Sequence, residues 1–95
     1  PAQTDAYFGL ASTYFNKGID VLKEADKVPL DDMTGAYDKL KNESFDYFKK
    51  AIPNLQKVLE TKPNDFQSLK ALRNIYSLLN MKAEFQEIDA LLKQQ

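Results

Sequence analysis

The sequence predicts an all-α domain built from antiparallel helical hairpins, and three observations lead to this prediction. Apolar residues recur at helical spacing along almost the whole chain. The 95 residues include only three glycines and four prolines, too few for the tight turns of an all-β chain. Hydrophobic residues make up 43% of the chain and charged residues 28%, which is typical of a globular domain and not of a disordered segment.

The first helix is expected over residues 4–27. Its apolar positions form two overlapping rows, which predicts a helix covered on two sides. Gly18 lies inside these rows, and a glycine in a helix interior costs about 1 kcal/mol. A turn at Gly18 is the alternative interpretation, but the apolar pattern continues beyond it. The two rows are Tyr7, Leu10, Ala11, Tyr14, Gly18, Leu22 and Ala25, and Phe8, Phe15, Ile19 and Leu22.

The second helix is expected over residues 33–61, after a loop that contains Pro29. Asp31 or Asp32 is expected to cap its start, because a carboxylate there accepts hydrogen bonds from free backbone N–H groups. Pro53 lies inside the pattern, where it removes one backbone hydrogen bond. We expect a kink and not an end, since the apolar row continues in phase on both sides. That row is Met33, Tyr37, Leu40, Ser44, Tyr47, Ala51, Leu55 and Val58.

Pro63 ends this pattern, and two shorter helices are expected over residues 65–79 and 82–93. Asn64 followed by Gln67 three residues later predicts a capping box at the start of the third helix. Asn80 is the predicted turn residue. Short connections predict antiparallel neighbours, so residues 1–95 are expected to form one domain. The predicted inward positions are Phe66, Leu69, Leu72, Tyr76 and Leu79, and then Met81, Phe85, Ile88 and Leu92.

The composition argues against several kinds of chemistry. Cysteine and histidine are both absent, which excludes disulfides, thiolate chemistry and histidine acid–base catalysis. The net charge of −1 gives no basic field for nucleic acid, and no apolar run approaches the roughly 20 residues of a membrane span. We therefore expect neither an enzyme nor a cofactor, a metal site, a nucleic-acid partner or membrane insertion. A soluble protein is expected, with the cytoplasm and a bacterial periplasm both open, and the initial proline indicates a fragment of a longer chain.

The pattern of the first and second helices resembles the tetratricopeptide repeat, a helix–turn–helix of about 34 residues with the pattern W-x2-L-G-x2-Y, A-x3-F and P. The matching positions of the first copy are Tyr7, Leu10, Ala11 and Tyr14, then Ala51, Leu55 and Pro63. Tyr14 and Ala51 are 37 residues apart, where the repeat has about nine. The surplus is itself helical by periodicity. We interpret it as two arms that lengthen both helices by about 16 Å at 1.5 Å per residue.

A second copy of the same pattern begins in the third helix and departs from it at three places. Leu69, Leu72 and Tyr76 match the first helix of the repeat. The departures are Arg73 in place of a small residue, Phe85 in place of alanine and Asp89 in place of an aromatic residue. The resemblance covers most of the chain, and the fourth helix is its weakest part.

The resemblance implies a protein-binding module, because partners of this family commonly dock on the concave surface lined by the first helices. Some members clamp a C-terminal carboxylate with a lysine and an asparagine one turn apart. Lys70 and Asn74 match that pair, whereas Phe8 and Ser12 at the corresponding places do not, and simple solvation explains Lys70 and Asn74 equally well. We expect a peptide or helix, acidic or carboxylate-bearing, to bind at Phe8, Ser12, Phe15, Lys70, Arg73 and Asn74.

Two alternatives stay open at this point. With roughly two repeats where solenoids usually need about three, the domain could instead be a structural spacer or a terminal capping unit of a longer helical array. The wide apolar face of the first helix also allows self-association through that helix.

Overall fold

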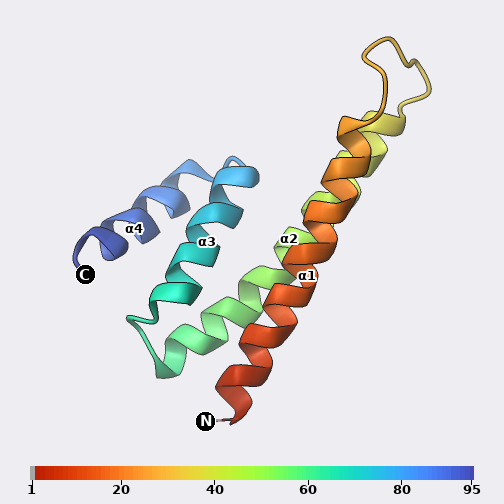
Figure 1. The fold of residues 1–95 in the computed structure, drawn as a ribbon. Coiled ribbons are helices and arrows are strands. Elements are labelled where there is room, and N and C mark those ends of the chain that lie inside the picture. Colours follow the sequence, from red (N-terminus) through yellow and green to blue (C-terminus); the bar gives the residue numbers. More distant parts are fainter. Residues whose placement is uncertain (1) are drawn as a thin grey trace.

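A computed structural model describes residues 2–95 and contains four α-helices in this range, with no strand. They are α1 (Ala2–Asp26), α2 (Ala36–Thr61), α3 (Phe66–Leu78) and α4 (Lys82–Lys93). The prediction of an all-α fold of helical hairpins is therefore confirmed; Pro1 lies outside the described residues. Helices α1 and α2 form a long hairpin, α3 and α4 form a short one, and α3 packs against α2 (Figure 1). The molecule is elongated, with extents of 46 × 28 × 15 Å.

The long hairpin depends on Gly18, where α1 continues without a turn. The ring of Phe48 on α2 packs directly onto this glycine and is fully buried. A Cβ atom on Gly18 would lie 2.5 Å from Cε1 of that ring, which is closer than carbon atoms tolerate. Gly18 thus allows the close approach of the two helices, and the alternative of a turn at this position is wrong.

Two further aromatic rings surround Phe48. The ring of Phe15 lies 5.6 Å from it and that of Phe45 lies 6.5 Å from it, between centroids, and both pairs are tilted. Such tilted pairs are a favourable arrangement for aromatic quadrupoles. The Phe15–Phe48 pair therefore joins α1 to α2 at the middle of the hairpin, and the Phe45–Phe48 pair lies within α2.

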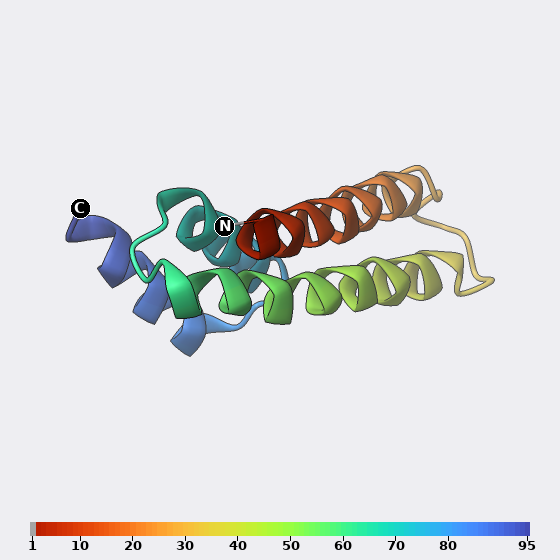
Figure 2. The same ribbon diagram turned by 90° about the horizontal axis from the view of Figure 1, so that it is seen from below.

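The hairpin stays closely packed beyond Gly18 toward its tip. Ala25, one residue before the end of α1, is fully buried, and so is Ser44 on α2. The hydroxyl of Ser44 donates to the carbonyl oxygen of Lys41 at 2.7 Å, so its polar atom is satisfied inside the interface. Figures 1 and 2 both show α1 and α2 side by side along this arm, as the sequence predicts.

The start of α2 differs from the prediction. The helix begins at Ala36 and not at Met33, and neither Asp31 nor Asp32 caps it. Gly35 is the N-cap, with φ of +81°, a left-handed conformation that turns the chain off the helical path. Met33 is consequently in the loop and 96% exposed, so its predicted inward position is wrong.

Helix α2 runs through Pro53 without ending, as predicted. Pro53 is exposed on the surface of the helix. In Figure 1 the second half of α2, which contains Pro53, bends away from α1 toward α3. The carboxyl-terminal half of α2 is therefore the part on which the second hairpin packs.

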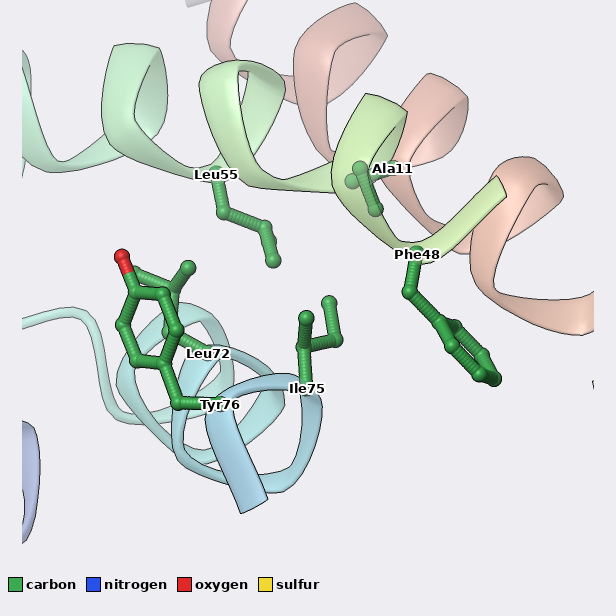
Figure 3. Packing of buried hydrophobic residues seen from close by; sticks show 7 residues of the cluster. Ala11, Phe48, Leu55, Leu72, Ile75 and Tyr76 are labelled. Atoms are coloured by element: carbon green, nitrogen blue, oxygen red, sulfur yellow. The ribbon is translucent and has the colours of Figure 1, made fainter. Parts of the chain in front are cut away.

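The core lies where α1, α2 and α3 meet (Figure 3). Leu55 on α2 and Ile75 on α3 point toward one another, with Leu72 one turn before Ile75 and Tyr76 directly after it. Ile75 is fully buried, although it was not among the predicted inward positions of this helix. Phe66 was predicted to point inward, but it is 49% exposed. The buried cluster is Ala11, Phe48, Ala51, Leu55, Leu72, Ile75 and Tyr76.

The start of α3 is capped one residue later than predicted. Asp65, and not Asn64, is the N-cap: its carboxylate accepts hydrogen bonds from the backbone N–H of Ser68 at 3.0 Å and from the Ser68 hydroxyl at 2.6 Å. Ser68 is fully buried, so this pair satisfies a polar side chain inside the fold. The predicted capping box with Gln67 does not form.

The turn between α3 and α4 follows the prediction. Asn80 adopts a positive φ of 59°, which asparagine tolerates better than most residues. The N–H of Met81 donates to the carbonyl oxygen of Tyr76 at 2.8 Å and closes the helix end. Helix α4 then packs on α3 through half-buried side chains, and none of its residues is fully buried. Its inward positions are Met81, Phe85, Ile88 and Leu92.

Replacing Gly18 by alanine is expected to destabilise the protein. The new methyl group would collide with the buried Phe48 ring, and such overpacking costs about 1–3 kcal/mol. Gly9→Ala in the same helix is the matched control. Gly9 has open space around it, so alanine there should raise the free energy of unfolding by about 0.5–1 kcal/mol through helix propensity. Urea unfolding measures both values, and a Gly18→Ala protein as stable as the wild type would contradict the close approach.

The cap of α3 gives a second matched pair. Asp65→Ala removes two hydrogen bonds at the helix start and should lower the free energy of unfolding by about 0.5–2 kcal/mol. Asn64→Ala should change it by less than about 0.5 kcal/mol, because the Asn64 side chain is exposed and outside the helix. Thermal unfolding followed by circular dichroism compares the two; a larger loss for Asn64→Ala would restore the capping-box interpretation.

Candidate partner-binding groove

An apolar groove separates α1 from α3, which lie on the same side of α2 (Figure 2). At its centre is a depression of about 170 Å³. Helix α1 supplies one wall, α3 supplies the other and Leu55 of α2 forms the floor. The lining residues are Phe8, Ala11, Ser12, Phe15, Asn16, Leu55, Ala71 and Ile75.

The groove continues at both ends. Phe8 also borders a depression of about 310 Å³ between the starts of α1 and α3, which includes Thr4, Asp65 and Gln67. Phe15 borders a third one with Asn74, Ser77 and Leu78 near the end of α3. The start of α1 thus faces the start of α3, so the two helices run parallel. An extended ligand would follow both helices in the same direction.

Four of the six predicted site residues surround this groove. Phe8, Ser12 and Phe15 line its centre from α1, and Asn74 borders its far end together with Phe15. Both phenylalanines are half-buried and pack on the core, so each presents only part of its ring to the groove. That these residues bind a partner stays a prediction.

Lys70 lies outside the lining of the groove. It is exposed on α3, one turn before Asn74, and its ammonium group is 5.9 Å from the centroid of the Phe66 ring. An ammonium over an aromatic face is attracted by the ring quadrupole, and at an exposed site the gain is about 0.5–1 kcal/mol. A ligand that recruits Lys70 has to compete with this contact.

Arg73 is turned away from the other predicted site residues and contacts α4. Its Nη1 atom lies 3.2 Å from Oδ1 of Asp89, and Nζ of Lys93 lies 3.0 Å from Oδ2 of the same carboxylate. Hydrogen bonds from Lys93 and from Arg73 hold the pKa of Asp89 below its ordinary value. Arg73 is thus engaged by Asp89 within the second hairpin, and its part in ligand binding stays a prediction.

This ion pair joins two of the three departures from the repeat pattern. Arg73 occupies the place of a small residue and Asp89 the place of an aromatic one, and the two side chains meet between α3 and α4. The side chains are 33% and 22% exposed, so the pair lies at the edge of the interface and water still reaches it. The pair therefore links α3 to α4 at the edge of their interface.

Sequence reasoning missed the opposite wall of the groove. Ala71 and Ile75 lie one turn apart on α3, and their small and branched side chains face Phe8 and Phe15. The signal in the sequence is weak: Ala71 and Ile75 are apolar and four positions apart, but the other neighbours of Ala71 at helical spacing, Gln67, Ser68 and Asn74, are polar. The role of Ala71 and Ile75 could not be assigned without knowing that α3 lies parallel to α1.

Among residues 2–95 there is no group of three acidic side chains placed to hold a metal ion.

Burial raises the pKa of Tyr76, whose ring is part of the core. Over residues 2–95, no helix combines the length and the apolar character needed to cross a membrane.

Comparisons of the chain with protein-family models, with curated proteins and with solved structures found no match. The resemblance to the tetratricopeptide repeat therefore depends on the residues of this sequence, and membership of that family stays a prediction.

The Asp89 cluster predicts a specific loss of stability in acid. The pKa of Asp89 in the folded state lies below the unfolded value of about 3.9. The ionised carboxylate therefore makes its full contribution to the free energy of unfolding above about pH 3.9, and this contribution is lost as the pH falls through the folded-state pKa. The difference in free energy of unfolding between wild type and Asp89→Asn should therefore be largest near pH 7 and shrink below about pH 3.9. Urea unfolding at a series of pH values measures it, and a difference independent of pH would contradict this assignment.

Proposed function

We propose that this domain is a non-enzymatic interaction module that binds an extended peptide or a helix of another protein in the groove between α1 and α3. The observation that carries the proposal is the open apolar groove between two parallel helices, with a floor supplied by the helix that connects them. Ligand side chains would bury the remaining exposed surface of Phe8 and Phe15. No cofactor is part of the proposal.

Membership of the tetratricopeptide repeat family is part of the same proposal. Ala11 and Ala51 occupy the small-residue places of the first copy and are 2% and 0% exposed, as close helix packing in such a repeat requires. The order of the helices, with α1 and α3 parallel and α2 between them in sequence, is also the order of consecutive repeats. The order and direction of the helices support the proposal independently of the motif.

The ligand would be recognised mainly through apolar side chains. Arg73 is engaged by Asp89, so Lys70 and Asn74 are the remaining predicted groups for an acidic or carboxylate-bearing ligand. Affinity should be modest, because an open groove buries less surface than a closed pocket and a disordered ligand loses entropy when it becomes ordered.

A terminal capping unit of a longer helical array is the second candidate, and one observation favours it. The exposed surface of α4 is mostly polar or small, as expected of a helix at the end of an array, and Leu91 at 38% exposure is its one large apolar side chain. The exposed residues are Lys82, Ala83, Gln86, Glu87, Ala90, Leu91 and Lys93.

Blocking the groove tests the proposed function. Ser12 is half-buried in the groove wall, so the larger side chain of Ser12→Arg would fill the space between Phe8 and Phe15. Thr13→Arg makes the same change in charge at the exposed neighbouring position. Peptides are selected against the wild-type chain from a display library of random 15-residue sequences, and their affinities are measured by isothermal titration calorimetry. Ser12→Arg should weaken binding about tenfold or more, a loss of about 1.4 kcal/mol, and Thr13→Arg should change it less than about twofold.

Nuclear magnetic resonance of the labelled chain identifies the binding surface in the same experiment. Amide signals of α1 residues 8–16 and of α3 residues 67–78 should shift when a selected peptide is added. Equal binding by Ser12→Arg and wild type, with shifts elsewhere, would place the site outside the groove. Selection of no peptide at all would favour the terminal capping unit.

A further inference from the structure

The tip of the long hairpin exposes large apolar side chains that the fold does not use. The connection between α1 and α2 lies at the end of the molecule far from α3 and α4 (Figure 1). Leu30 is fully exposed, Met33 is 96% exposed and Tyr37 at the start of α2 is 41% exposed. Isolated apolar residues are common on surfaces, but a leucine and a methionine projecting together from one tip form a patch that a partner can cover.

The connection is held by its own hydrogen bonds. The N–H of Asp32 donates to the carbonyl oxygen of Pro29 at 3.1 Å and closes a turn with Leu30 at its second position. The Asp32 carboxylate accepts from the Thr34 hydroxyl at 2.5 Å, and the Thr34 hydroxyl oxygen accepts from the N–H of Ala36 at 3.2 Å. Leu30 and Met33 are therefore displayed on a defined turn.

The tip is also carried on a firmly packed arm. The full burial of Ala25 on α1 and of Ser44 on α2 continues the contact between the helices toward the loop. The second hairpin packs on the other half of α2, so it leaves this end of the molecule uncovered (Figure 1). A partner could reach the tip while the groove between α1 and α3 is occupied.

The charge around the tip defines the chemistry of the partner. Residues 26–38 contain four aspartates and one lysine, and Lys39 and Lys41 follow on the first turns of α2, so the negative charge is concentrated at the loop itself. The lysine within this range, Lys27, forms an ion pair with Glu24 at 3.1 Å, so it does not offset the aspartates. A cleft of about 430 Å³ under the loop has apolar walls from Val28, Pro29 and Tyr37, with the carboxylates of Asp26, Asp32 and Asp38 also lining it. The electrostatic complement of this surface is cationic, and its apolar complement is a hydrophobic side chain.

We propose that the hairpin tip is a second interaction surface, which binds a segment of another protein that combines apolar side chains with lysine or arginine. Leu30 and Met33 contact the apolar side chains of that segment. A lysine or arginine enters the cleft, where its methylene groups lie on Val28 and Pro29 and its charge faces the aspartates. The Tyr37 ring already carries the ammonium group of Lys41, which lies 5.8 Å from the ring centroid. The proposal is independent of the function assigned to the groove, because none of its residues lines that groove.

The test uses the whole chain and the same display library of random 15-residue peptides. Peptides are selected on wild type after depletion on a Leu30→Ser, Met33→Ser double variant, which isolates sequences that need the tip. These peptides should be enriched in lysine or arginine together with apolar residues. Their affinity should fall about tenfold or more in the double variant. It should also fall when salt is raised from about 50 to about 500 mM, because the charge contribution is screened.

Two controls separate the tip from the groove and from a loss of folding. Leu91→Ser replaces a partly exposed leucine on α4 and should leave binding of the selected peptides unchanged. The double variant should keep the wild-type circular dichroism spectrum and melting temperature, because both replaced side chains are in solvent. Ser12→Arg should also bind these peptides normally, so failure of the groove proposal and failure of this one give different results.

Several outcomes would overturn the proposal. One is the recovery of no peptide after the depletion step, or the enrichment of acidic or uncharged peptides. Another is a dimer, seen by sedimentation velocity, that the double variant abolishes, since a second copy of the chain would then be the occupant. Tip-dependent binding to vesicles of phosphatidylcholine and phosphatidylglycerol would assign the patch to a lipid surface instead.

Discussion

The contact of the Phe48 ring with Gly18 is the constraint on which the rest of the structure depends. It brings α1 and α2 close enough for Ala11, Ala25, Ser44 and Ala51 to be buried between them. The same ring belongs to the cluster that receives α3, so the long hairpin and the second hairpin share one core. A side chain at position 18 would separate the two helices and disturb both parts of that core.

The second hairpin is joined by an ion pair between its two helices. Arg73 on α3 and Asp89 on α4 form this pair, with Lys93 as a further partner of the carboxylate. An ion pair at a partly exposed interface contributes less than apolar packing, which agrees with the absence of fully buried residues in α4.

The long hairpin places two different surfaces at a distance from one another. The groove between α1 and α3 is lined mainly by apolar side chains, whereas the tip combines exposed leucine and methionine with acidic residues. A packed helical pair connects them, so their separation is set by the fold and not by a flexible linker. Two ligands of different chemistry fit such an arrangement, one along the first helices and one at the end of the arm.

The sequence by itself determined the four helices, their approximate bounds and the continuity of the chain through Gly18 and Pro53, because helical periodicity is a local property of residue spacing. It also identified one wall of the groove through Phe8, Ser12 and Phe15. Only the tertiary structure decided that Gly35 delays the start of α2, that Met33 and Phe66 are exposed, and that Arg73 faces α4. The tertiary structure was also needed to show that Ala71 and Ile75 form the opposite wall of the groove. Each of these features depends on a backbone conformation or on contacts between segments far apart in the chain, and periodicity along one helix carries no information about either.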